Sequence, residues 1–482
     1  MKLALPPTGI DHHQARICTC CPEESHDDAC DPASRQLPAP SNARVIEDLL
    51  GRPPVTLDLS AVRADLENRV ILLTGAAGSI GSELARQIAP FRPARLVLLD
   101  RSESDLYFLH LELQEAHPGL DLVPVLCDIT NQTRLSQVCA QHRPQYVIHA
   151  AAYKHVPLME TNVLEAVRNN VLGTLLVATT AVRFGAAKLL LVSTDKAIRP
   201  CNVMGASKRV AERIIFGLPN LHRAGTDFRA VRFGNVLASK GSVIPLFERQ
   251  LAAGGPITVT HPMVTRYFMT IPEAAQLVLQ TGALPETAGA IAVLEIGEPV
   301  RILDLAEKLI RFSGRVPGRD IQIVFTGLRP GEKLTEVQIS ALEATVPTSA
   351  EKIRISHTQE NAGPELAQGL ARLLTCLEAG DHEGSRTTLC ELVPECEPPL
   401  RQFPLPSAPP PENPRSAAWA SLVAPRETGW RERRRDALRA AEPPDPLDRR
   451  GSVACRRKTP RVGGRRRTDM GVLLATGPRA LS

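Results

Sequence analysis

The sequence lacks any apolar run of about 18 residues, the approximate length that a membrane-spanning helix needs. It also lacks an amino-terminal secretory signal, so its 11 cysteines favour reduced cytosolic thiols over a disulfide framework. We therefore expect a cytoplasmic protein without a membrane span.

A second cysteine pair with zinc-site spacing is also missing. One Cys-x-x-Cys pair, Cys18 with Cys21, lies close to His12 and His13 near the start of the chain. Structural zinc sites commonly combine two such pairs, and no partner pair follows. The sequence therefore predicts no metal site.

A basic excess is missing from most of the chain. The whole sequence has 57 Lys+Arg and 52 Asp+Glu, but residues 396–482 hold 18 of the basic residues and only 9 of the acidic ones. The remainder carries 39 basic and 43 acidic residues, which gives no electrostatic reason to expect nucleic acid as a partner.

The composition divides the chain into five segments. Residues 1–43 mix proline, serine and charge without periodicity and are expected to be a disordered leader. An adaptor segment at 44–68 leads into a dinucleotide-binding domain at 69–240, and a smaller substrate-binding portion is expected at 241–395. Residues 396–482 contain 14 prolines and arginine blocks, which predicts a disordered tail.

A glycine-rich turn near residue 75 is the strongest local motif. It follows an apolar run and leads into a helical pattern. Gly75 permits the tight turn, Gly78 lets the backbone approach a pyrophosphate, and Gly81 lets the helix pack closely on the sheet. The free N–H groups of the helix would then face the phosphates. The cofactor residues predicted here are Gly75, Gly78, Ser79, Ile80 and Gly81.

A second apolar strand ends at Asp100, 25 positions after Gly75, where a carboxylate can accept hydrogen bonds from ribose hydroxyls. Its negative charge would repel a 2′-phosphate, which favours NAD. Arg101 and Ser102 follow directly and could receive that phosphate, so NADP remains an alternative.

Four more apolar runs, beginning near residues 122, 145, 189 and 229, alternate with helical patterns. This alternation predicts an α/β fold with a doubly wound parallel sheet of the Rossmann type and a smaller carboxyl-terminal portion. The third strand ends at Asp128 and Ile129, where adenine usually lies. The fourth ends in Ala150, Ala151 and Ala152, whose small side chains would let a cofactor approach the backbone.

Later motifs carry a specific resemblance. In family order, the chain contains Thr74-Gly-Ala-Ala-Gly-Ser-Ile-Gly-Ser-Glu83, His149-Ala-Ala-Ala-Tyr-Lys154, Asn169-Asn170-Val-Leu-Gly173, Ser193-Thr-Asp-Lys196, Arg232-Phe-Gly-Asn235, Thr265-Arg266-Tyr-Phe-Met269 and Gly327-Leu-Arg329-Pro-Gly-Glu-Lys333. Over residues 44–395 it resembles the nucleoside-diphosphate-sugar 4,6-dehydratases, a branch of the extended short-chain dehydrogenases.

One position departs from the ordinary short-chain dehydrogenase pattern. These enzymes use Tyr-x-x-x-Lys, in which the lysine lowers the tyrosine pKa so that tyrosine can move a hydroxyl proton. Here the lysine is Lys208, but Met204 occupies the tyrosine position. A large subgroup of the dehydratases is similar in carrying methionine there, so an active enzyme is expected.

The resemblance assigns roles to three consecutive residues. It implies that Asp195 is the acid for the departing C6 oxygen and that Lys196 is the base at C5. Lys196 must be neutral for this, which burial beside Lys208 or the oxidised nicotinamide would favour. Thr194, Asp195 or a water would handle the C4 hydroxyl proton, and the sequence leaves that choice open.

The remaining assignments are also positional. Lys208 and Asn170 are expected on the cofactor side, and His149 is expected to be a packed strand-end residue. The predicted substrate-binding residues are Lys154, Asn235, Arg266 and Arg329, although Lys154 could equally form a structural ion pair. The family often continues Gly-Glu-Lys-Leu with Tyr-Glu-Glu, whereas this chain has Thr335-Glu-Val.

The expected function is therefore dehydration of a nucleotide sugar, with UDP-N-acetylglucosamine as the expected substrate, to a 4-keto-6-deoxy product with NAD regenerated each turnover. A nucleotide-sugar 4-epimerase and a non-catalytic nucleotide-sugar-binding scaffold are the alternatives. A homo-oligomer is expected. Because many relatives carry amino-terminal membrane helices, the chain is interpreted as a soluble form or as a fragment of a longer one. The configuration at C5 stays open.

Overall fold

The computed structural model describes residues 60–218, 225–339, 344–356 and 363–397. The predicted leader, most of the adaptor and nearly all of the tail lie outside these residues, as does the Cys18–Cys21 pair. Within the described part, no helix combines the length and the apolar character needed to cross a membrane.

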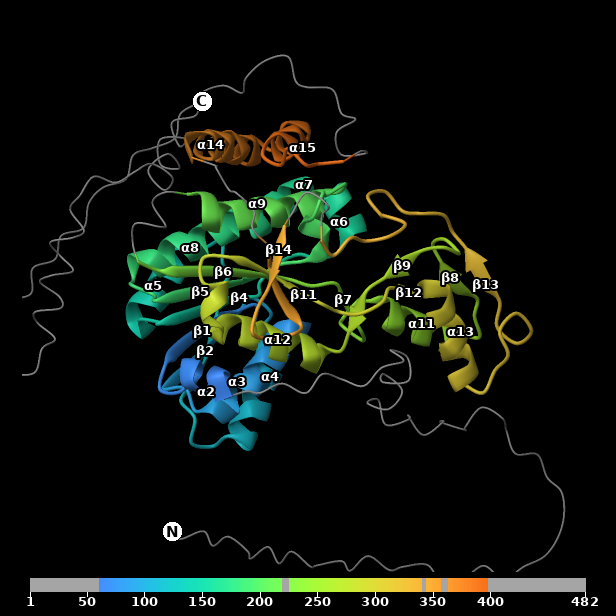
Figure 1. Cartoon of the computed structure of the whole chain (residues 1–482), viewed down its shortest axis with the longest axis horizontal. Coiled ribbons are helices and arrows are strands. Elements are labelled where there is room, and N and C mark those ends of the chain that lie inside the picture. The colour runs from blue at the N-terminus through green and yellow to red at the C-terminus, as the bar shows by residue number, and fades with distance from the viewer. Residues whose placement is uncertain (1–59, 219–224, 340–343, 357–362, 398–482) are drawn as a thin grey trace, which may run out of the picture. The chain divides into compact units, whose positions relative to one another are not determined.

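A nine-stranded sheet forms the centre of the molecule, in the order β14-β15-β11-β6-β5-β4-β1-β2-β3 (Figure 1). The seven strands from β11 to β3 are parallel to one another. The two pairings at the other edge, β15 with β11 and β14 with β15, are antiparallel. The strands are β1 Val70–Thr74, β2 Arg95–Asp100, β3 Leu122–Leu126, β4 Tyr146–His149, β5 Lys188–Val192, β6 Asp227–Arg232, β11 Ile291–Leu294, β14 Thr345–Pro347 and β15 Ile353–Ser356.

The first six strands occupy the positions that the apolar runs predicted, and the predicted doubly wound fold is confirmed. The strand order reverses between β1 and β4, whose carboxyl ends lie side by side. Such a switch point is where open α/β sheets bind ligands.

Helices cover both faces of the sheet, and the central strands are therefore buried on both sides. One face packs against α2 Ser60–Leu66, α3 Ser79–Ile88, α4 Glu103–Ala116 and α12 Ile271–Ala283. The other packs against α5 Gln132–His142, α8 Gly173–Arg183 and α9 Val203–Gly217.

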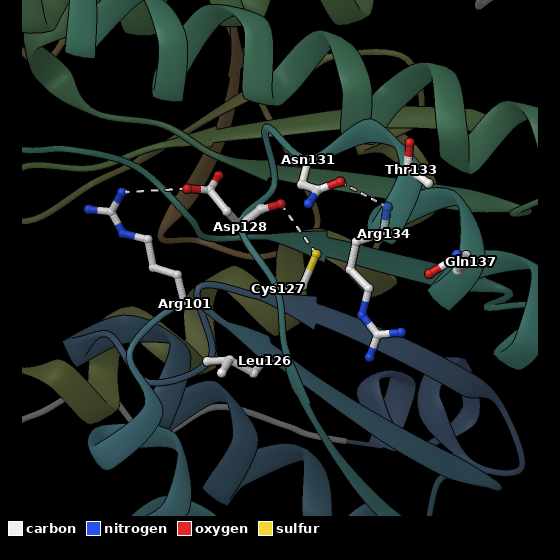
Figure 2. Close-up of a pocket in the computed structure, with 8 residues that line it drawn as sticks. All are labelled: Arg101, Leu126, Cys127, Asp128, Asn131, Thr133, Arg134 and Gln137. Atoms are coloured by element: carbon white, nitrogen blue, oxygen red, sulfur yellow. Dashed lines mark hydrogen bonds and ion pairs between the residues drawn. The ribbon is translucent and has the colours of Figure 1, made fainter. Parts of the chain in front are cut away.

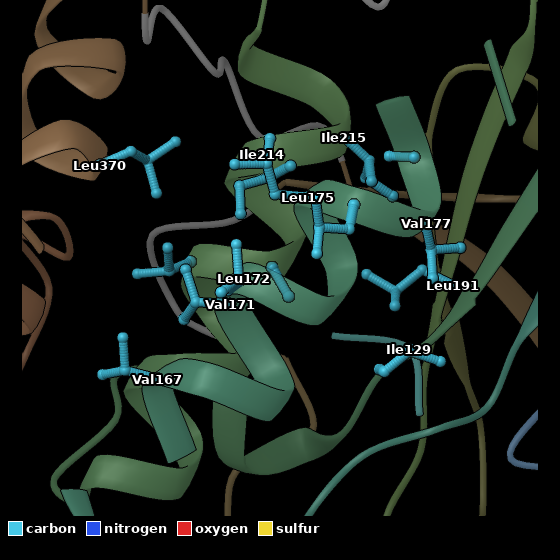
Figure 3. Close-up of a cluster of buried hydrophobic side chains, with 14 of the residues drawn as sticks. Ile129, Val167, Val171, Leu172, Leu175, Val177, Leu191, Ile214, Ile215 and Leu370 are labelled. Atoms are coloured by element: carbon cyan, nitrogen blue, oxygen red, sulfur yellow. The ribbon is translucent and has the colours of Figure 1, made fainter. Parts of the chain in front are cut away.

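An additional helical layer lies outside α9. It consists of α14 Gly363–Ala379 and α15 His382–Glu391, whose apolar side chains join the buried cluster that includes Ile214 and Leu370 (Figure 3). The sequence analysis did not identify α15, because most of its buried positions are small or polar.

A small subdomain lies beside the main sheet (Figure 1). Its elements are α11 Val243–Ala252, β8 Ile257–Val259, β9 Thr265–Arg266, β12 Val300–Arg301, α13 Ile302–Phe312 and β13 Ile323–Phe325. They share their own apolar core around Phe247 and Ile310. A short parallel pair, β7 Asn235–Val236 with β10 Phe268–Met269, leads into it.

The predicted boundary at residue 240 needs correction. Residues 241–395 do not form one separate portion, because β11 pairs in parallel with β6 and thereby extends the main sheet. Helix α12 packs on α3, and α14 and α15 pack on the far side. Burial of these apolar elements against the existing sheet accounts for the arrangement.

Candidate active site at the carboxyl edge of the sheet

The turn after β1 has the geometry of a phosphate-binding loop. Gly75 has φ +70°, and a Cβ there would lie 2.5 Å from the backbone nitrogen of Ala151. A Cβ on Gly81 would overlap the carbonyl oxygen of Gly75. Helix α3 follows with Gly78 as its N-cap and no side-chain cap, so its first N–H groups face out of the loop. These features fit a dinucleotide pyrophosphate.

A pocket of about 230 Å³ adjoins this loop. Ten of the predicted cofactor residues line it: Gly75, Gly78, Asp100, Arg101, Ser102, Asp128, Ile129, Ala150, Ala151 and Ala152. The pocket thus collects residues from the carboxyl ends of four adjacent strands, β3, β2, β1 and β4.

Five predicted cofactor residues are absent from that lining: Ser79, Ile80, Gly81, Asn170 and Lys208. The Ser79 hydroxyl accepts a hydrogen bond from the backbone of Lys240 at 3.0 Å, while Ile80 packs into the core. Sequence reasoning missed Lys240, which lines the pocket and pairs with Asp105 at 2.6 Å.

Asp100 has a second role that the sequence did not indicate. One carboxylate oxygen accepts from the backbone N–H of Ala77 and the other from that of Ser102, both at 2.9 Å. The carboxylate therefore braces the glycine-rich turn as well as lining the pocket. Each oxygen retains capacity for a ribose hydroxyl.

Arg101 bridges the outer wall of the site. Its guanidinium lies 3.9 Å from Asp128 and 4.5 Å from the ring centroid of Tyr153. Figure 2 shows Arg101 and Asp128 in the adjoining pocket, which is also lined by Leu126, Cys127, Asn131, Thr133, Arg134 and Gln137. Arg101 and Arg134 are thus two cations that line the same pocket as Asp128.

Asn170 supports the cofactor wall from behind. Its side-chain oxygen accepts from the backbone of Tyr153 at 2.8 Å, and its amide donates to the Tyr153 carbonyl and to Ser207, both at 3.0 Å. It lies in a π-helical turn, Val167–Leu172, a form often found at functional sites. These bonds fix the backbone that follows Ala152.

The predicted acid and base residues lie just after β5. The Thr194 hydroxyl donates to Oδ1 of Asp195 at 3.0 Å, and the Lys196 ammonium donates to the same oxygen at 3.0 Å. Lys196 also donates to Oδ1 of Asn235 at 2.9 Å. Both Asp195 and Lys196 are largely buried, with side chains 2% and 17% exposed. The structure thus brings these four side chains together, whereas the sequence analysis expected Asn235 among the substrate-binding residues.

Glu336 joins this group and was missed. Its side chain is 4% exposed, and Oε1 lies 3.8 Å from Nζ of Lys196. The available signal was an acidic residue just after the Gly331–Lys333 motif, but nothing local in the sequence links it to Lys196.

The charge on Lys196 differs from the expectation of a neutral amine. Burial by itself would lower its pKa, but the carboxylates of Asp195 and Glu336 outweigh burial and raise it. Lys208, the expected neighbour, instead donates to the carbonyl of Val192 at 2.8 Å, and burial lowers its pKa to about 8. Lys196 is therefore an ammonium in this arrangement.

Met204 and His149 are both packed side chains. Met204 is 3% exposed and belongs to the apolar core beneath α9. His149 bonds Thr74 at 2.7 Å and Thr174 at 3.1 Å, and burial, aided by Lys208, lowers its pKa to about 3. A neutral, doubly bonded imidazole fits the packed role expected for His149.

The predicted substrate residues fall into two groups. Arg266 is 6% exposed, and its guanidinium donates to the carbonyls of Thr265, Leu334 and Lys333 and to Glu332. It therefore holds the 332–336 segment in place.

Lys154 and Arg329 are exposed at the surface of the same region. Arg329 donates to Glu332 at 3.2 Å, and partial desolvation of the ammonium lowers the pKa of Lys154 even though the residue as a whole is exposed. Burial lowers the pKa of His155, and the charges of Lys154 and Arg329 lower it further. Both cations therefore lie near this imidazole.

Comparisons with known proteins agree with this geometry. Residues 71–358 match the family model described as "Polysaccharide biosynthesis protein". The chain is 52% identical over 309 residues to the Staphylococcus aureus capsular polysaccharide biosynthesis protein CapD, covering 64% of this chain and 51% of that protein. The chain thus spans about half the length of that relative.

Two further matches concern fold and chemistry. The chain is 31% identical over 285 residues to a Rickettsia rickettsii UDP-glucose 4-epimerase, covering 57% of this chain and 79% of that protein. The solved structure of Pen from Bacillus thuringiensis has a TM-score of 0.56 and 30% identity, covering 61% of this chain and 89% of that one. With a family match over more than half its length, this chain belongs to the polysaccharide biosynthesis protein family.

Proposed function

We propose that this protein removes water across C5 and C6 of a nucleotide sugar, UDP-N-acetylglucosamine, and forms a 4-keto-6-deoxy product. The observation that carries the proposal is the buried cluster of Thr194, Asp195 and Lys196 at the carboxyl end of β5, one strand away from the dinucleotide pocket. An acid and a base placed together at that edge suit elimination of water.

A bound nicotinamide would supply transient hydride acceptance from C4 and hydride return to C6. The loop from Gly75 to Gly81 and the carboxylate of Asp100 would hold the dinucleotide, and Lys208 would face its nicotinamide ribose. Asp195 takes up the C4 hydroxyl proton and then gives it to the departing C6 hydroxyl, and Lys196, once it has lost a proton, takes the proton from C5. The Thr194 hydroxyl, hydrogen-bonded to Asp195, connects that carboxylate to the C4 hydroxyl proton.

Two cations are suited to the diphosphate of the substrate. Lys154 and Arg329 are exposed and share one neighbourhood, whereas Arg266 acts by fixing the 332–336 segment. Among the residues that the structure describes, the guanidinium of Arg329 donates only to Glu332, so it retains donors for phosphate oxygens.

A 4-epimerase is the second candidate, because the Rickettsia relative carries that name. That reaction removes and returns the C4 hydroxyl proton but needs neither an acid at C6 nor a base at C5. Met204, a thioether at the usual tyrosine position, cannot move that proton in either reaction, so the feature that favours dehydration is the buried pair of Asp195 and Lys196.

Incubation of the purified protein with UDP-N-acetylglucosamine, followed by mass spectrometry, tests the proposal. We expect a product lighter by one water molecule. A product of unchanged mass with altered C4 configuration would establish the epimerase, and cofactor binding without conversion of any nucleotide sugar would establish the scaffold.

We infer that the cofactor is NAD, because the Asp100 carboxylate occupies the ribose side of the pocket. The competing feature is the pair Arg101 and Arg134 in the neighbouring pocket, which could bind a 2′-phosphate (Figure 2). Heat release and chromatography of the nucleotide decides between them, and recovery of mainly NADP would refute the inference.

A further inference from the structure

Glu336 has a buried carboxylate whose surroundings leave one oxygen without a partner. Oε1 lies 3.8 Å from Nζ of Lys196 and 4.0 Å from Nε of Arg266. Oε2 is buried and has no hydrogen bond within the part of the chain that the structure describes. An unpaired buried carboxylate oxygen destabilises a fold, so its presence calls for a functional explanation.

The backbone next to Glu336 is held firmly in place. The N–H of Thr265 donates to the carbonyl of Leu334 at 3.1 Å, and Arg266 donates to the carbonyls of Leu334 and Lys333 at 3.2 and 2.8 Å. Strand β9 therefore carries the segment that delivers Glu336 to Lys196.

Asp195 repeats the pattern of Glu336. One oxygen of Asp195 accepts from Lys196 and Thr194, while Oδ2 is buried without a hydrogen-bond partner among the described residues. Lys196 is thus shared by two buried carboxylates, and each of them has one oxygen able to take a proton.

We propose that Glu336 is a positioning residue that controls the proton on Lys196. Its carboxylate holds the Lys196 ammonium in the resting site and accepts one proton from it during the reaction. The N–H bond of the ammonium breaks, an O–H bond forms on Glu336, and the neutral amine then takes the C5 proton of the sugar. This role rests on the proposed dehydration.

The charges around Lys196 give the sign of the expected effect. Asp195 and Glu336 raise its pKa, Arg266 on β9 lowers it, and Asn235 on β7 contributes an uncharged acceptor. Because a nearby opposite charge favours the charged form of a group, loss of the Glu336 charge should lower the Lys196 pKa.

The first experiment measures Lys196 without any turnover. Lysines are dimethylated with ¹³C-formaldehyde, which preserves their charge, and the Lys196 signal is identified by its loss in Lys196→Arg and titrated by NMR. We expect a midpoint above that of the same group in the unfolded protein, a lower midpoint in Glu336→Gln, and recovery towards the original value in Glu336→Asp.

Glu332→Gln is the matched control, because it removes a carboxylate from the same segment that pairs with Arg266 and Arg329. In this variant the titration midpoint of Lys196 should stay unchanged, even if the KM for the nucleotide sugar rises. An equal midpoint in Glu336→Gln and wild type, or a wild-type midpoint below the unfolded value, would overturn the proposal whether or not dehydration is observed.

The second experiment measures exchange of the C5 hydrogen in deuterated solvent. Glu336→Gln should slow exchange by about 10²-fold or more and should move the pH dependence of kcat to lower pH, whereas Glu332→Gln should not move it. Wild-type rate and pH profile in Glu336→Gln would refute the role of Glu336. Absence of conversion by wild type would instead refute the dehydratase function, leaving the NMR titration to decide on Glu336.

Discussion

Lys196 donates a hydrogen bond to Oδ1 of Asp195 at 3.0 Å, so the proposed base and the proposed acid share one oxygen contact. The same oxygen accepts from Thr194, while Oδ2 of Asp195 has no partner in the described part of the chain. This arrangement holds the carboxylate in one orientation and leaves its other oxygen without a hydrogen bond.

Replacing Asp195 by asparagine should abolish dehydration while the cofactor stays bound. The amide keeps the shape of the carboxyl group but cannot give a proton to the C6 hydroxyl in the same way. Positioned acid–base groups contribute roughly 10²–10⁴-fold, so a loss of that size is expected in kcat. Product formation by mass spectrometry and nucleotide content after heat release are the two measurements.

Lys196→Met should additionally stop incorporation of solvent deuterium at C5. Asp304→Asn, on the exposed first turn of α13, serves as the control and should behave as wild type. Losses well below roughly tenfold in both site variants would contradict the assigned acid and base roles.

Met204→Tyr should not improve the enzyme. Met204 is 3% exposed in a packed core, so a larger ring with a hydroxyl should destabilise the fold by about 1–3 kcal/mol. If Thr194 and Asp195 already manage the C4 proton, the added phenol gives no gain. Thermal unfolding and kcat test this, with Met204→Leu as the volume-matched control, and a clear rise in kcat for the tyrosine variant would contradict the prediction.

Gly75→Ala should release the cofactor. The added Cβ would lie 2.5 Å from the backbone nitrogen of Ala151, at the wall of the dinucleotide pocket. Gly185→Ala is the matched control, because Gly185 has a similar φ of +77° but no atom within 4 Å of the added Cβ. Both variants carry the backbone strain of about 1 kcal/mol or more, and a reduced nucleotide content is expected for Gly75→Ala alone. Equal nucleotide content in the two proteins would count against the close approach.

Because His149 is buried as a neutral imidazole, the free energy of unfolding should fall as the solution becomes acidic. Burial lowers its folded-state pKa to about 3, whereas an unfolded histidine titrates near its ordinary value of about 6.5. Between these values the unfolded state binds the extra proton, so the free energy of unfolding falls as pH falls, by at most about 1.4 kcal/mol per pH unit. Below the folded pKa this contribution stops changing.

Urea unfolding at several pH values measures this dependence. His149→Asn should flatten the acid slope even though it loses the bonds to Thr74 and Thr174. His382→Asn, at the exposed start of α15, should keep the wild-type slope. An unchanged slope in His149→Asn would show that other groups cause the loss.

Local features were readable from the sequence because their physics is local. The turn from Gly75 to Gly81 requires glycine at fixed spacing, and the neighbouring positions of Asp195 and Lys196 along the chain place them at one strand end. The alternation of buried strands with helical patterns was sufficient to predict the doubly wound sheet.

Only the tertiary structure decided which distant segments meet. An apolar run such as Ile291–Leu294 fits a separate portion as well as the main sheet, and pairing with β6 made it part of the sheet. The charge on Lys196 likewise depends on Glu336, which reaches it because Arg266 and β9 hold the 332–336 segment. Electrostatic interactions and strand pairing act through space, so the sequence determined the glycine-rich turn and the adjacency of Asp195 and Lys196, while the fold determined the raised pKa of Lys196.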